Sequence, residues 1–119
     1  MIKITISEPV PSLNVTLSEH WAVKRKRKGV YERDILLALL EKYTLKERRA
    51  AMEKVPRAVR IHSKRARKLD IDNLFGGGKS LIDALRSCKL LVEDNEEWLL
   101  SLEYTQETGR PYSTTITIT

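Results

Sequence analysis

Four segments of the chain alternate between apolar and polar residues, and this pattern constrains the fold more than any other feature. Successive side chains of a strand point to opposite faces, so such alternation predicts strands that are buried on one side only. We expect the second segment to stay extended as far as Asp72, because Leu69 and Ile71 keep its parity. The apolar positions are Ile2, Ile4 and Ile6; Val59 and Ile61; Trp98, Leu100, Leu102 and Tyr104; and Tyr112, Thr114, Ile116 and Ile118.

Between these segments the apolar spacing changes to three and four residues, which is the period of a helix. One stripe contains Ile35, Leu36, Leu39, Leu40 and Tyr43, and a second contains Leu74, Leu81, Ile82 and Leu85. Residues 44–47 read as a capping box, which predicts a further short helix or a kinked continuation. We expect the later helix to become regular near residues 78–79, since three glycines precede it. We interpret residues 11–20 as a loop and residues 105–111 as a turn.

The resulting order, β-α-(α)-β-α-β-β, predicts an α+β fold with a small mixed β-sheet and helices packed on one face. The chain has 119 residues, 41% of them hydrophobic, which suits one domain over residues 1–119. Its longest nearly apolar run is residues 35–40, far below the 18–20 residues of a membrane span. The single cysteine, Cys88, excludes an internal disulfide and suits a cytoplasmic protein.

Charge is distributed unevenly along the chain. Residues 21–69 carry 17 Lys or Arg against five Asp or Glu, whereas residues 70–119 carry four against nine. A protein that only coats nucleic acid has little use for acids beside its basic surface. A nuclease needs both, because cations bind phosphates and carboxylates bind divalent metal.

Two clusters of cations are candidates for DNA binding. We call the first, residues 24–28, the basic run, and the second, within residues 64–68, the second basic cluster. The five consecutive cations of the basic run repel one another, which predicts a mobile arm or loop until phosphates neutralise them. The alternative is that both clusters are solvated faces that keep the protein soluble. The basic run is Lys24, Arg25, Lys26, Arg27 and Lys28, and the second basic cluster is Lys64, Arg65, Arg67 and Lys68.

Asp70 and Asp72, the acidic pair, follow the second basic cluster directly. In an extended chain they project together at about 6–7 Å, close enough to share a cation. Mg²⁺ favours such oxygen ligands, and Mn²⁺ is a possible substitute. An Asp-x-Asp also occurs in turns and caps, so the motif alone leaves that alternative open.

Lys79 and Asp83 lie four residues apart, so on a helix they share a face. They are either an ordinary surface ion pair or a lysine that faces the metal site and is oriented by Asp83. Glu93 and Asp94, the acidic loop, are either turn residues or the carboxylates that complete an acidic cluster. A phosphate-loop interpretation of residues 76–80 fails, because Asn73 stands where that motif needs its first glycine.

The succession Asp70-Ile71-Asp72-Asn73-Leu74, Lys79, Ile82-Asp83-Ala84-Leu85 and Glu93-Asp94 resembles the RusA family of Holliday junction resolvases, which phages and prophages often encode. Residues 4–6 and 9–14 are similar to the family's opening strand and Pro-Ser-x-Asn loop. The stretch before Lys79 is longer than in the shortest family form, by roughly the three glycines.

The resemblance implies a homodimeric, Mg²⁺-dependent crossover junction endodeoxyribonuclease of DNA recombination and repair. Its substrate would be branched DNA, and it would cut four-way junctions with paired nicks. By the same resemblance, Asp70, Asp72 and Asp94 are metal-binding and catalytic, and Lys79 is the essential lysine. Asp83, Glu93 and Asn73 are supporting positions. The competing hypothesis is a non-catalytic basic module that binds DNA or RNA, with the acids serving as caps and ion pairs.

Overall fold

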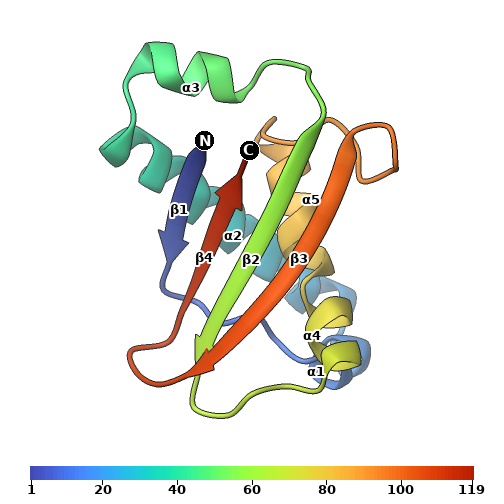
Figure 1. The fold of residues 1–119 in the computed structure, drawn as a ribbon. Helices are drawn as coiled ribbons and strands as arrows, with labels where there is room; N and C mark the ends of the chain where they lie inside the picture. Colours follow the sequence, from blue (N-terminus) through green and yellow to red (C-terminus); the bar gives the residue numbers. More distant parts are fainter.

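The four alternating segments form a single mixed β-sheet. The computed structural model describes residues 1–119. Its strands are β1 (Ile2–Ile6), β2 (Arg57–Arg65), β3 (Leu99–Thr108) and β4 (Ser113–Ile118). Their order is β1-β4-β2-β3, with β4 antiparallel to both neighbours and β2 parallel to β3 (Figure 1). The predicted small mixed sheet is therefore confirmed.

Five helices complete the α+β fold. They are α1 (Leu13–Ser18), α2 (Trp21–Lys42), α3 (Leu45–Ala51), α4 (Ile71–Gly77) and α5 (Lys79–Ser87). Figure 1 shows α2 and α5 behind the sheet, α1 and α4 together near the end of β2, and α3 at the other end, close to both termini. α2 packs on α5, and α1 packs on α4. None of these helices combines the length and apolar composition that a membrane crossing requires.

The core lies between the sheet and the helix layer. Alternate side chains of β1, β2 and β4 are buried, as the period-two pattern predicts. Tyr31, Ile35 and Leu39 of α2 and Leu81 and Leu85 of α5 meet them from the other side. Leu36 and Leu40, expected on the same apolar stripe of α2, are exposed, because each lies one residue, about 100° of helix rotation, after a buried position. Burying one such aliphatic side chain contributes about 1.5–3 kcal/mol, so this face fixes how the helices sit on the sheet.

The opposite face of the sheet carries polar side chains. Arg60 on β2 pairs with Glu103 on β3, with 3.0 Å between Nη2 and the carboxylate oxygen. Thr5 and Thr115 hydrogen-bond across β1 and β4 at 3.1 Å. The sheet therefore has one apolar and one polar face.

β3 differs from its prediction at both ends. Leu100, expected to be inward, is 65% exposed, because the register of β2 and β3 slips there and leaves it opposite no partner. The strand also continues to Thr108, through residues expected to turn. Its parallel pairing with β2 extends to Arg65 opposite Thr108, and these ladder hydrogen bonds extend the strand.

One short helix, α1, was not predicted, and another, α4, begins before the point at which a regular helix was expected. α1 occupies the expected loop, and its first turn is capped by Ser12, whose Oγ accepts a hydrogen bond from the Val15 N–H at 3.2 Å. α4 occupies the expected extension of β2 and part of the glycine stretch. The capping box is confirmed at the start of α3: the Glu47 N–H donates to Thr44 Oγ1, and the Thr44 N–H donates to Glu47 Oε1.

Candidate nucleic-acid interface and acidic residues

The acidic pair lies at the start of a helix and not on a strand. β2 ends at Arg65, Asp70 is the N-cap position of α4, and Asp72 lies in its first turn. The strand predicted for the pair is therefore wrong: Asp70 has extended backbone angles just before the helix, whereas Asp72 is helical, so the alternation of a strand does not relate their side chains. Ile71, expected to be inward, is 70% exposed. Both aspartates are exposed, and Asp72 is favoured at a helix N-terminus by the macrodipole.

Gly77 and Gly78 allow the segment around α4 to pack closely against neighbouring parts of the chain. A Cβ on Gly77 would lie 1.6 Å from the Pro11 carbonyl oxygen. A Cβ on Gly78 would lie 2.3 Å from the Tyr104 hydroxyl oxygen. These close approaches seat α4 against the α1 segment and β3. α5 then begins at Lys79, as predicted.

Lys79 is exposed on the first residue of α5, but Asp83 does not pair with it. Asp83 Oδ1 instead accepts a hydrogen bond from Arg86 Nη1 at 3.5 Å. Arg86 Nη2 reaches the Glu93 carboxylate at 2.8 Å. The expectation that Asp83 orients Lys79 is therefore corrected: Arg86 joins Asp83 to the acidic loop. Sequence reasoning missed Arg86, although its spacing of three from Asp83 was a usable signal.

One end of β3 holds the acidic pair in place. Leu69, which precedes Asp70, exchanges two hydrogen bonds with the side chain of Gln106 on β3. The Leu69 N–H donates to Gln106 Oε1 at 2.8 Å, and Gln106 Nε2 donates to the Leu69 carbonyl at 2.9 Å. Gln106 is two residues from the end of β3 at Thr108.

The acidic loop lies at the other end of the same strand. The carbonyl of Asn95, which follows Asp94, accepts a hydrogen bond from the N–H of Leu99, the first residue of β3, at 2.8 Å. Gln106 lies seven positions after Leu99 along the strand, about 23 Å at the usual rise per residue. Figure 1 shows the α5–β3 loop and the start of α4 at opposite ends of the molecule.

Within one chain, therefore, Asp94 does not join Asp70 and Asp72, contrary to expectation. No group of three or more His, Cys, Asp or Glu side chains is placed to hold a metal ion. Carboxylate oxygens are the donors that Mg²⁺ prefers, but their placement in a single chain does not fit a shared ion. Asn73, half-buried on α4, belongs to the acidic-pair end.

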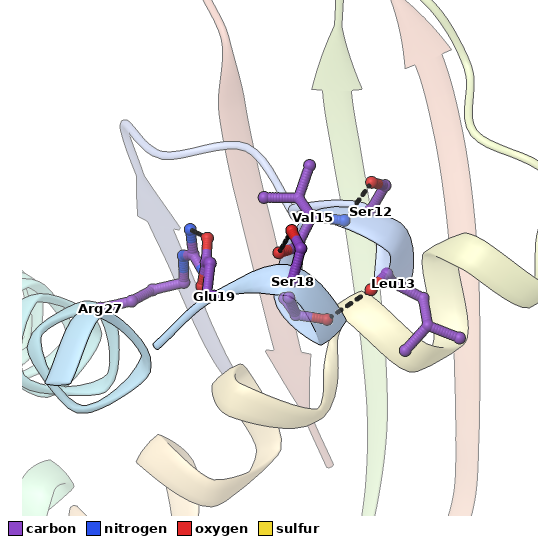
Figure 2. A network of polar contacts seen from close by, with 7 residues as sticks. Ser12, Leu13, Val15, Ser18, Glu19 and Arg27 are labelled. Carbon is purple, nitrogen blue, oxygen red and sulfur yellow. Dashed lines mark hydrogen bonds and ion pairs between the residues drawn. The ribbon is translucent and has the colours of Figure 1, made fainter. Parts of the chain in front are cut away.

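The basic run is helical, not a mobile arm. Residues 24–28 lie in the first half of α2, where His20 caps the helix by accepting a hydrogen bond from the Ala22 N–H at 3.2 Å. Lys and Arg are good helix formers, and acids flank the run. Figure 2 shows Arg27 paired with Glu19 through both of its terminal nitrogens. Lys28 Nζ lies 3.8 Å from Glu32. The helix points the five cations in different directions, and these ion pairs offset part of their charge. Both effects reduce the repulsion on which the prediction of a mobile arm was based.

The helix divides the basic run between two sides. Lys24, Arg25 and Lys28 line a depression of about 420 Å³ together with Lys79 and Asp83 of α5. Lys26 and Arg27 line a separate depression of about 410 Å³ beside the 8–12 loop. The structure thus brings three predicted DNA-binding residues to the predicted lysine of the site. It places the other two elsewhere.

The second basic cluster lies near the end of β2 and lines no part of the depression that contains Lys79, although its Arg65 lines the other depression with Lys26 and Arg27. Arg65 Nη1 donates to the Val10 carbonyl at 2.8 Å, which ties the 8–12 loop to the sheet. Lys64 is half-buried, whereas Arg67 and Lys68 are exposed in the connection to α4. Arg65 therefore has a structural partner, and Arg67 and Lys68 are free to meet solvent ions.

Neither the comparison with protein-family models nor the search of curated proteins finds a match for this chain. The resemblance to RusA resolvases accordingly depends on the chain's own residues, above all the acidic pair, Lys79, Asp83 and the acidic loop.

Proposed function

We propose that the chain is an Mg²⁺-dependent, structure-selective endodeoxyribonuclease that nicks four-way DNA junctions, with Mn²⁺ as a substitute metal. The supporting observation is the depression that Lys79 shares with Lys24, Arg25 and Lys28. Exposed cations around one concave surface attract a phosphate backbone. α4, which carries Asp72, directly precedes α5, so acids and cations occupy adjoining elements.

The proposal includes a homodimer. Asp94 lies beyond one end of β3 and the acidic pair beyond the other, so one chain cannot assemble three carboxylates. A two-fold dimer has two copies of each group and can place Asp94 of one chain beside Asp70 and Asp72 of the other. A bound Mg²⁺ would activate water and stabilise the departing oxygen of the phosphodiester.

Each chain's own residues have separate tasks in this proposal. The α2 cations hold the backbone, and Lys79 offsets negative charge on the phosphate that is cut. Arg86 keeps Glu93 and Asp83 paired, so that these acids do not repel the strand. Two equivalent sites match the two symmetry-related strands that a four-way junction presents.

A second candidate is a basic module that binds DNA or RNA without cutting it. The absence of a three-carboxylate cluster within one chain favours it. In that case the acids would serve only as caps and ion pairs, as Asp83 and Glu93 do with Arg86.

A cleavage assay with a synthetic four-way junction in Mg²⁺ distinguishes the endonuclease from the non-cutting binding module. We expect wild-type protein to introduce nicks, and Asp70→Asn to lower the cleavage rate by more than about 100-fold, because even outer partners of a metal ligand contribute 10–100-fold. Binding of the junction should be retained. Glu41→Gln, an exposed acid on the far half of α2, is the matched control and should cut normally. Binding without cutting in both Mg²⁺ and Mn²⁺ would favour the second candidate.

A further inference from the structure

Three depressions follow one another along α5. The first, described above, shares Lys28 and Asp83 with a second of about 430 Å³. The second shares Arg86, Lys89 and Val92 with a third, also about 430 Å³, which ends at Lys54 beyond α3. Each depression shares lining residues with the next, so the three form a row along α5, which we call the α5 groove.

At least two cations line each of the three depressions, although Arg86 is paired with Asp83 and Glu93, and Lys28 lies 3.8 Å from Glu32. The four cations of the first depression continue with Arg86, Lys89 and Lys54. Asp83, the only acid that lines it, is paired with Arg86 at 3.5 Å. α5 itself is about 13 Å long, which matches about four phosphates of one strand of a duplex.

Lys89 stands in a backbone conformation that favours glycine. Its φ is 66°, the only positive φ of a non-glycine residue in the chain. The Leu90 N–H donates to the Leu85 carbonyl at 3.0 Å, and the Lys89 N–H donates to the Arg86 carbonyl at 3.1 Å. This is a Schellman ending, in which the position of Lys89 is usually glycine. The chain thus carries a lysine where the fold alone would favour a residue without a side chain.

We propose that the α5 groove binds the phosphate backbone of a duplex arm of DNA, with Lys89 and Lys54 contacting phosphates at the end remote from Lys79. The proposal deepens the proposed function, since it takes DNA as the partner from there. It adds contacts that lie outside both predicted basic clusters. Lys89 extends the binding surface past α5 toward the loop that holds Asp94.

The test compares Lys89→Gly with wild type in two measurements. Glycine suits the backbone at this position, so urea unfolding should show a midpoint at or above that of wild type. Binding to a labelled four-way junction should weaken. The plot of log affinity against log salt should become less steep, its negative slope decreasing in magnitude by about 0.9, the value for one duplex phosphate contact. Lys89→Gly with Lys54→Gln should lower the slope by about 1.8. Lys3→Gln, on the polar face of edge strand β1, is the control and should leave it unchanged.

An unchanged slope in both groove variants would overturn the proposal. So would an equal loss of affinity for polyglutamate, because the groove would then accept any polyanion. Cleavage in Mg²⁺ is scored on the same samples. If the wild-type protein cuts the junction but the variants show an unchanged salt slope, the groove proposal is wrong and the endonuclease proposal stands. If the groove variants show a less steep salt dependence but no sample cuts the junction, the groove proposal stands and the endonuclease proposal is wrong.

Discussion

Gly77 is the residue at which one added methyl group should do most harm. Its Cβ would overlap the Pro11 carbonyl oxygen, and backbone cannot move aside as a flexible side chain can. We expect Gly77→Ala to lower the free energy of unfolding by about 3 kcal/mol or more, at the upper end of the cost of overpacking. Urea unfolding monitored by circular dichroism measures this.

Gly29→Ala is the matched control in the same experiment. Gly29 also lies in a helix, but nothing stands within 4 Å of its added Cβ. This variant should gain about 0.5–1 kcal/mol from helix propensity. Equal stability of the two variants would contradict the close packing of α4 on the Pro11 segment.

Cys88 should make stability depend on pH in the alkaline range. Burial, with a smaller contribution from the charge of Glu32, raises the pKa of its thiol from 9.0 to about 11. Between these values the unfolded chain loses a proton that the folded chain keeps, so the free energy of unfolding falls as pH rises. The loss attributable to Cys88 should reach at most about 2–3 kcal/mol near pH 11.

Urea unfolding of wild type and Cys88→Ala at a series of pH values isolates this effect. The difference in unfolding free energy between the two proteins should shrink as the pH rises from about 9 to 11. A difference that is constant with pH would mean that the thiol ionises as readily in the folded chain as in the unfolded one.

The positions of Asp70 and Asp72 could be predicted from the sequence only if the secondary structure around them was predicted correctly. Asp70 and Asp72 were predicted on a strand because Leu69 and Ile71 keep the parity of β2. The chain instead forms α4, which packs closely against Pro11 at Gly77 and against Tyr104 at Gly78. That approach is a tertiary contact between distant segments, which no local pattern of apolar residues reports.

At the scale of elements, α2 shows how a local rule can mislead. Repulsion among five cations predicted a mobile arm, whereas helix propensity and acids on the flanks of the run favour a helix. By contrast, the capping box predicted α3 correctly, because both of its hydrogen bonds lie within four residues. α1 could have been found from Ser12, a strong N-cap residue before a short run.

The two sides of α2 should contribute differently to DNA binding. Lys24 lines the α5 groove, whereas Lys26, two residues away and also exposed, lines the other depression. We expect Lys24→Ala to lower the salt slope of junction binding by about 0.9. Lys26→Ala should leave the slope unchanged. Fluorescence anisotropy over about 50 to 200 mM salt measures both, and equal slopes for the two variants would mean that the sides are equivalent.

For the whole molecule, period-two alternation was enough to predict four strands and the apolar face of β1, β2 and β4, but not that of β3. It could not predict that β2 and β3 are parallel neighbours, because strand order depends on crossovers between distant segments. That pairing decides the candidate site. A parallel β2–β3 unit places the residues after β2 and the residues before β3 at opposite ends of the sheet, which separates Asp70 from Asp94.

In the proposed dimer, each site combines the aspartates of two chains. A mixture of the Asp70→Asn and Asp94→Asn variants tests this arrangement. If Asp94 acts across a dimer, each mixed dimer keeps one intact site. The mixture should then nick a four-way junction with about a quarter of the wild-type site number and without paired cuts. Each variant alone should be inactive. A mixture no more active than its components, beside an active wild type, would contradict the arrangement.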